Sequence, residues 1–128
     1  MRTKALWVSV LAMTLVHCDD HVLGDNTQAE VQCDHEPPLT YENFGDGFLR
    51  QHCNGCHSSY REYEWQRSGA PGGIDFDTWD TLLEWSDRVQ IRTEQGTMPP
   101  SGGPTAEERS LFLEWMACEV LPEARRVQ

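Results

Sequence analysis

Five consecutive residues, Cys53-Asn54-Gly55-Cys56-His57, constrain this 128-residue chain more than any other feature. The spacing Cys-x-x-Cys-His is typical of covalent haem attachment, in which each thiol adds to one vinyl group of the porphyrin. The imidazole that follows can then bind the iron through Nε2 as the proximal ligand. Asn54 and Gly55 are small, so the backbone can lie against the porphyrin edge. The motif therefore predicts one covalent haem c, held by Cys53, Cys56 and His57.

Two other kinds of site use closely spaced cysteines, a structural zinc site and a dithiol redox pair. A closed zinc site needs four nitrogen or sulfur ligands, usually supplied as two pairs. The remaining cysteines, Cys18, Cys33 and Cys118, each stand alone in the sequence. A thioredoxin-like pair should follow a buried apolar strand, whereas residues 48–52 are amphipathic and helix-like. Both alternatives stay open, and haem attachment is the favoured interpretation.

Residues 1–17 have the proportions of an export signal. Two basic residues precede an apolar run over residues 5–16, which is too short to span a bilayer. Export agrees with the haem motif, because c-type haem is attached outside the cytoplasm in bacteria. We therefore expect a periplasmic protein.

The end of this signal leaves two outcomes open. Leu15-Val16-His17-Cys18 resembles a bacterial lipobox, whose final cysteine is acylated and becomes the mature N-terminus. His17 departs from that pattern, since a small residue normally precedes the cysteine. Lipidation of Cys18 would make the protein a membrane-anchored lipoprotein, whereas cleavage a few residues further on would discard Cys18 with the signal peptide.

The chain is acidic, with 21 aspartates and glutamates against ten lysines and arginines and a net charge of −11. Residues 1–17 hold Arg2 and Lys4 and no acidic residue, so their removal lowers the net charge by two, to −13. Such a surface repels nucleic acid and anionic lipid headgroups, and it favours protein partners with a basic docking patch.

Composition divides the remainder into three parts. Residues 18–38 are polar and acidic, have no apolar period and end in two prolines, so we expect an extension or tether. Residues 39–122 are long enough for one domain, and residues 123–128 are expected to form a frayed tail.

Hydrophobic periodicity predicts that this domain is all-α, without a convincing strand. The expected segments are a helix over residues 41–52, a loop over 58–76, and helices over 77–95 and 105–121. The second helix should begin with Asp77 as N-cap and end at Gly96. The third should open with a capping box of Thr105 and Glu108 and stop before Pro122. Four tryptophans are expected in the core or against the haem: Trp65, Trp79, Trp85 and, most surely, Trp115.

From about residue 41 to residue 121 the chain resembles a small class I cytochrome c. Beside the haem motif, the resemblance rests on two residues of the first helix and two of the last: Gly45, Leu49, Phe112 and Trp115. It implies a helical domain wrapped around one haem, in which the last helix crosses the first at Gly45. A glycine there would let the two helices pack tightly. The acidic extension, Cys33 and Cys118 depart from the family pattern, which does not require them.

The resemblance also implies that Met98 is the second axial ligand of the iron. Met98 lies in Thr-Met-Pro-Pro, 41 residues after His57, which is similar to the distal ligand loop of the family. The neighbouring prolines stiffen this loop, so its sulfur is presented at little entropic cost. Three other side chains compete for this role: Met116, which falls on an apolar helix face and is expected in the core, His35, and His52, which is too close to Cys53 to reach the far side of the haem.

The cysteine count predicts a disulfide. If Cys53 and Cys56 bind haem and Cys18 is acylated or removed, an exported protein keeps two thiols, Cys33 and Cys118. We expect a bond that ties the extension to the end of the last helix; two free thiols are the alternative.

The resemblance implies an electron carrier rather than an enzyme, since His57 and Met98 would occupy both axial positions. It would pass single electrons between redox proteins. Two other functions stay open. One is an accessory haem subunit of a larger membrane oxidoreductase, and the other is a haem-based sensor, which needs a labile distal ligand.

Overall fold

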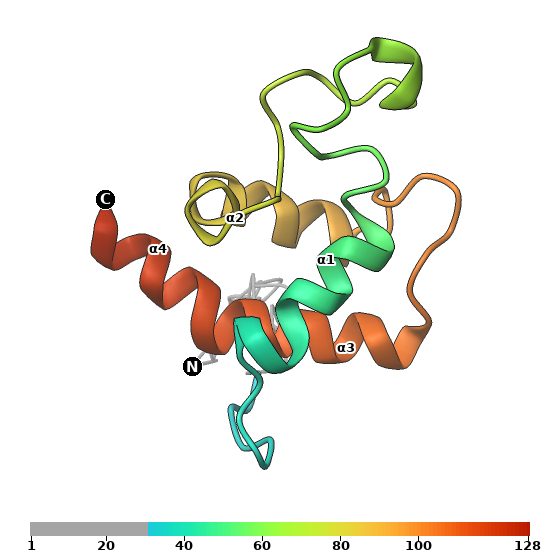
Figure 1. The fold of residues 1–128 in the computed structure, drawn as a ribbon. Coiled ribbons are helices and arrows are strands. Elements are labelled where there is room, and N and C mark those ends of the chain that lie inside the picture. Colours follow the sequence, from blue (N-terminus) through green and yellow to red (C-terminus); the bar gives the residue numbers. More distant parts are fainter. Residues whose placement is uncertain (1–30) are drawn as a thin grey trace, which may run out of the picture.

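The computed structural model describes residues 31–128, and this part of the chain is helical, with no β-strand (Figure 1). The elements in chain order are η1 (Tyr41–Gly45), α1 (Asp46–His52), η2 (Glu64–Gln66), α2 (Trp79–Glu94), α3 (Ala106–Trp115), η3 (Met116–Val120) and α4 (Leu121–Val127). The π-helical turns η1 and η3 lead directly into α-helices, and η2 is a single 3₁₀ turn. The prediction of an all-α domain is therefore confirmed.

The first predicted helix is present over its expected length, as η1 followed by α1. Thr40 caps it, because its hydroxyl accepts a hydrogen bond from the backbone N–H of Asn43. The Asn43 side chain accepts one in return from the Thr40 N–H, at 2.7 Å. This reciprocal capping box satisfies two N–H groups that a helix start would otherwise leave without partners.

The predicted start of the second helix is wrong by one residue. Thr78, not Asp77, is the N-cap of α2, and its hydroxyl accepts from the Thr81 N–H. The Asp77 carboxylate instead accepts a hydrogen bond from the Ser59 N–H at 2.6 Å, so it is engaged outside the helix. The expected end at Gly96 is confirmed, since Gly96 has a φ of +66°, the left-handed region that glycine enters without strain.

The third predicted helix begins as expected but continues past its expected end. Thr105 and Glu108 form the capping box. The chain nevertheless stays helical through Pro122 to Val127, so the predicted stop and the frayed tail are both wrong. The π turn just before the proline changes the bonding register, because the Leu121 N–H donates to Met116 O, five residues back. Burial of Leu121 and Ala124 in the core then holds α4 in place.

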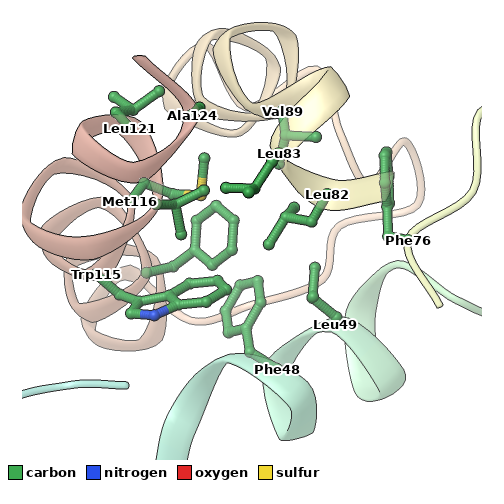
Figure 2. Close-up of a cluster of buried hydrophobic side chains, with 12 residues drawn as sticks. Phe48, Leu49, Phe76, Leu82, Leu83, Val89, Trp115, Met116, Leu121 and Ala124 are labelled. Atoms are coloured by element: carbon green, nitrogen blue, oxygen red, sulfur yellow. The ribbon is translucent and has the colours of Figure 1, made fainter. Parts of the chain in front are cut away.

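The hydrophobic core lies where α1, α2 and the C-terminal helices meet (Figure 2). Phe48 of α1 points towards Trp115, and Leu49 points towards Leu82 of α2 (Figure 2). Phe48 also stacks on Phe112, with ring centroids 4.2 Å apart. Met116 is completely buried there, as expected for a core methionine, and so is Trp115. Trp65 is not a core residue, because 79% of it is exposed on the loop between α1 and α2.

Gly45 and Trp115 are in close contact in this core. A β-carbon at position 45 would lie only 2.2 Å from Cζ2 of the Trp115 ring, well inside van der Waals contact. The two segments can therefore approach this closely only because residue 45 has no side chain. This packing agrees with the reason expected for Gly45 from its sequence position.

We predict that Gly45→Ala lowers the free energy of unfolding by about 1–3 kcal/mol, because the added methyl overpacks the core. Gly47→Ala is the matched control, since a β-carbon there meets nothing within 4 Å. The control should raise the same free energy by about 0.5–1 kcal/mol, as alanine favours a helix over glycine. Urea unfolding followed by far-UV circular dichroism measures both. Equal effects of the two substitutions would contradict the steric explanation.

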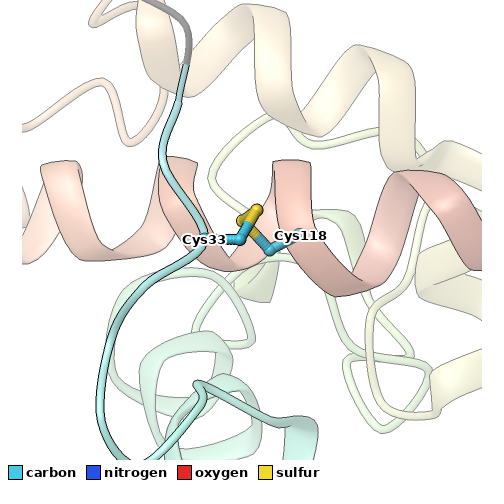
Figure 3. The surroundings of a disulfide bond; sticks show 2 residues. All are labelled: Cys33 and Cys118. Carbon is cyan, nitrogen blue, oxygen red and sulfur yellow. A yellow bond between two sulfur atoms is a disulfide. The ribbon is translucent and has the colours of Figure 1, made fainter.

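The predicted disulfide is present and joins Cys33 to Cys118, with 5.7 Å between their α-carbons (Figure 3). Cys33 lies in the extended segment before η1, and Cys118 lies in η3. The bond thus ties the segment that precedes the first helix to the C-terminal helices. Cys18 lies outside the described residues, as do the predicted signal and most of the extension. Within residues 31–128, no helix combines the length and the apolar character needed to cross a membrane.

We predict that the double variant Cys33→Ser/Cys118→Ser is less stable than the wild type. The bond closes a loop of 85 positions, for which the chain-entropy model sets an upper figure of about 4–5 kcal/mol. Urea unfolding compares the proteins, and peptide mapping without reductant verifies the pairing. Recovery of both residues as unmodified thiols from native protein would refute the assignment.

Candidate functional site

The Cys-x-x-Cys-His motif forms a tight turn at the C-terminal end of α1. Cys53 is the C-cap residue, and its N–H donates to Leu49 O at 2.8 Å. The N–H groups of Cys56 and His57 then both donate to Cys53 O, at 3.1 and 2.9 Å. Neither Cys53 nor Cys56 takes part in a disulfide. The turn therefore brings two available thiols and one imidazole together on a short stretch of chain.

His57 is held in one orientation by a hydrogen bond and a stacked ring. Its Nδ1 lies 2.8 Å from Ile74 O, and its ring stacks on Phe76 with a centroid distance of 4.8 Å. A carbonyl oxygen only accepts hydrogen bonds, so Nδ1 must carry the proton. The other ring nitrogen, Nε2, then keeps its lone pair free for a metal. Ligating histidines in proteins usually have this arrangement, in which a second group fixes the ring through the opposite nitrogen.

The loop that supplies Ile74 O is organised by a buried arginine. Arg67 is only 5% exposed, although it lies in the loop between α1 and α2. Its guanidinium donates to four carbonyls and one carboxylate: Ser58 O, Ala70 O, Pro71 O, Ile74 O and Asp75 Oδ1. Sequence reasoning predicted this loop but missed Arg67. The sequence feature that could have indicated this role is the position of Arg67 directly before a Gly/Pro-rich run, because the carbonyls of such a run lack regular hydrogen-bond partners.

Asp77 closes the same loop at its base. Its carboxylate accepts hydrogen bonds from Ser59 N–H, while the Phe76 N–H donates to His57 O at 2.9 Å. Partial burial alone would raise the pKa of Asp77. Hydrogen bonds from Ser58 and Ser59, together with the charge of Arg67, nevertheless hold that pKa below its ordinary value of 3.8. The ionised carboxylate is therefore favoured by the folded chain.

Cys53 does not have the lowered pKa of an attacking thiol in a dithiol redox pair. Burial raises the pKa of its thiol to about 12, so the thiol stays protonated at neutral pH. Catalytic Cys-x-x-Cys pairs need the opposite, a thiol whose pKa is lowered to give a reactive thiolate. As for a metal site made of side chains alone, no group of three or more His, Cys, Asp or Glu residues suited to a metal ion occurs within residues 31–128.

Met98 lies in the loop between α2 and α3, and 40% of the residue is exposed. Its N–H donates to Arg92 O at 3.2 Å, which fixes the start of this loop to the end of α2. Of the two alternative imidazoles, His52 is engaged elsewhere, since its Nε2 lies 3.7 Å from a Glu108 carboxylate oxygen. His35 Nδ1 lies 2.7 Å from Pro37 O, which is the arrangement seen at His57, so this bond leaves the other ring nitrogen of His35 available and does not remove His35 as an alternative.

Two cavities of the described part lie away from the motif. The larger, of about 310 Å³, lies between α2 and α4 beside Trp79, and the other, of about 240 Å³, lies beside the Cys33–Cys118 disulfide. Neither is lined by Cys53, Cys56, His57 or Met98. These two cavities therefore do not mark the motif, and the candidate residues are identified by their chemistry and hydrogen bonds.

Comparison with known proteins does not identify a family for this chain. The chain matches no protein-family model, no curated protein and no solved structure.

We predict that Asp77 contributes to stability above about pH 4 and loses this contribution in acid. Its native pKa lies below that of the unfolded chain, so the unfolded state binds the proton more readily and stability falls as pH drops through the native pKa. The excess stability of wild type over Asp77→Asn should therefore shrink between pH 5 and about pH 2. Urea midpoints across this range measure it, with Asp80→Asn as a control for the loss of one negative charge. An excess that does not change with pH would refute the role of ionised Asp77.

Proposed function

We propose that this protein is an exported monohaem c-type cytochrome that carries single electrons between redox proteins. The observation that carries the proposal is the state of His57, whose Nδ1 is bound to Ile74 O directly beside two unpaired cysteines. An imidazole held through Nδ1, next to two cysteines that form no disulfide, is the donor set that covalent haem attachment requires. The residues present therefore fit a haem c.

Each residue of this set has a separate task. Cys53 and Cys56 would hold the porphyrin through thioether bonds, and His57 and Met98 would be the axial ligands of the iron. Haem c supplies one-electron chemistry when bound, because its iron is stable in both the ferrous and ferric states. The chain fixes the His57 ring through Ile74 O and Phe76, so this ligand needs little rearrangement when the charge on the iron changes.

The proposed partners are redox proteins with a basic docking surface, since the chain has a net charge of −11. The proposed place of action is the periplasm, with Cys18 as a lipid anchor if the lipobox is used.

The attachment residues are tested by expressing the protein with a haem-maturation system and recording a pyridine haemochrome spectrum. Wild type should give one haem c per chain that survives acid–acetone extraction. Cys53→Ser and Cys56→Ser should each leave a single thioether or none, and the double variant should lose covalent haem. The matched control is Cys33→Ser/Cys118→Ser, which removes two cysteines outside the motif and should keep it. Wild-type protein without haem would refute the proposed function.

We further predict that Met98→Ala keeps covalent haem but loses the weak near-infrared band of sulfur bound to ferric iron. Its reduction potential should fall and its iron should bind cyanide or CO, because thioether ligation raises the potential and closes the sixth position. Met116→Leu is the matched control, since this buried methionine lies in the core and its replacement should keep the band. A Met98→Ala protein that retains the band would assign another ligand. Rapid CO binding by wild-type ferrous protein would favour a haem sensor instead.

A further inference from the structure

Arg67 places a buried positive charge on the carbonyl that holds His57. Its Nη2 lies 3.3 Å from Ile74 O, and the same oxygen accepts from His57 Nδ1 at 2.8 Å. The guanidinium also donates to Ser58 O at 2.7 Å, immediately after His57 in the chain. The two ends of the loop that flank the imidazole are thus bound to one cation. Arg67 therefore does more than close the loop, because it and His57 donate to the same acceptor, Ile74 O.

Asp75 is the carboxylate that pairs directly with Arg67, and the charge of Arg67 also acts on Asp77. Asp75 Oδ1 lies 2.6 Å from Nη2, and the two side chains are only 5% and 16% exposed. Charges in such a position are screened less by solvent than surface charges, so each can act on its neighbours. The carboxylate belongs to the residue directly after Ile74, so both members of the pair lie close to the shared carbonyl.

We propose that the Arg67–Asp75 pair is a positioning and tuning device, which sets the strength of the hydrogen bond from His57 Nδ1–H to Ile74 O and through it the reduction potential. This inference rests on the proposed function. A carbonyl that accepts from a guanidinium has less electron density to offer the His57 N–H, so the imidazole is a weaker donor to iron. Weaker donation favours the ferrous state and a higher potential, and hydrogen bonding around an axial ligand is a known means of such control. Asp75 opposes this effect by reducing the positive charge.

The two members of the pair therefore have opposite expected effects. Arg67→Gln leaves Asp75 as an uncompensated negative charge and frees Ile74 O for His57, so the midpoint potential should shift downward. Asp75→Asn keeps the shape of the side chain and leaves the guanidinium charge unbalanced, so the potential should shift upward. Arg67→Lys restores the charge without the planar fork and should recover part of the Arg67→Gln shift. Arg61→Gln removes an exposed arginine of the same loop and should change the potential little.

Redox titration of the haem-loaded proteins measures these shifts, and the proton NMR signal of His57 Nδ1–H gives a second readout. This resonance should move in opposite directions in Arg67→Gln and Asp75→Asn. Far-UV circular dichroism verifies folding, and the near-isosteric Asp75→Asn decides the test if Arg67→Gln does not fold. If the pair only closed the loop, Arg67→Gln and Asp75→Asn would shift the potential in the same direction, and Arg67→Lys would not recover the shift of Arg67→Gln. Either result overturns the proposal. The haem content of the wild type is measured before any variant is made. A wild type without haem would overturn the proposed function itself.

Discussion

The close approach of Trp115 to Gly45 is the contact on which the arrangement of this domain depends. The indole occupies the space of a missing side chain, so the first helix and the C-terminal helices approach closely at this point. Trp115 also meets rings from η1 and α2, Tyr41 and Trp79, each with a centroid distance of 6.4 Å. One buried ring therefore fixes three segments relative to one another. The end of α1, where the Cys-x-x-Cys-His turn begins, is placed by this crossing.

After that turn, the loop between α1 and α2 is held by hydrogen bonds and an ion pair more than by apolar packing. The loop between α1 and α2 directs large side chains to solvent, with Tyr63 and Trp65 stacked on each other at a centroid distance of 6.2 Å. Apart from the single turn η2, this loop has no regular helix or sheet to satisfy its backbone. A guanidinium with five N–H donors can bind several of its carbonyls at once. The ion pair with Asp75 makes this arrangement possible, because an uncompensated buried charge is strongly destabilising. The same loop then holds His57 through Ile74 O.

The features that could be predicted from the sequence are those decided by neighbouring residues or by one strong motif. The Thr105 capping box and the glycine end of α2 are local, and the disulfide followed from counting thiols. The features that were missed depend on distant partners. Asp77 is drawn out of its capping position by Ser59, and Pro122 is tolerated because a π turn and burial of α4 compensate for it. Arg67 could not be assigned because its acceptors are loop carbonyls, which no side-chain pattern reveals.

The Cys33–Cys118 bond also has a consequence for the timing of maturation. Residues 31–128 contain four cysteines, and four cysteines allow three complete pairings. Cys53 and Cys56 are three positions apart, whereas the native pair is separated by 85, so the local pair closes sooner in an unfolded chain. If the protein is exported and binds haem as proposed, an oxidising compartment would favour the local bond first, and that bond would consume the two thiols that attach the haem. The yield of haem-loaded protein would then depend on the order in which the cysteines are oxidised, so that a reductant would be needed early and an oxidant late.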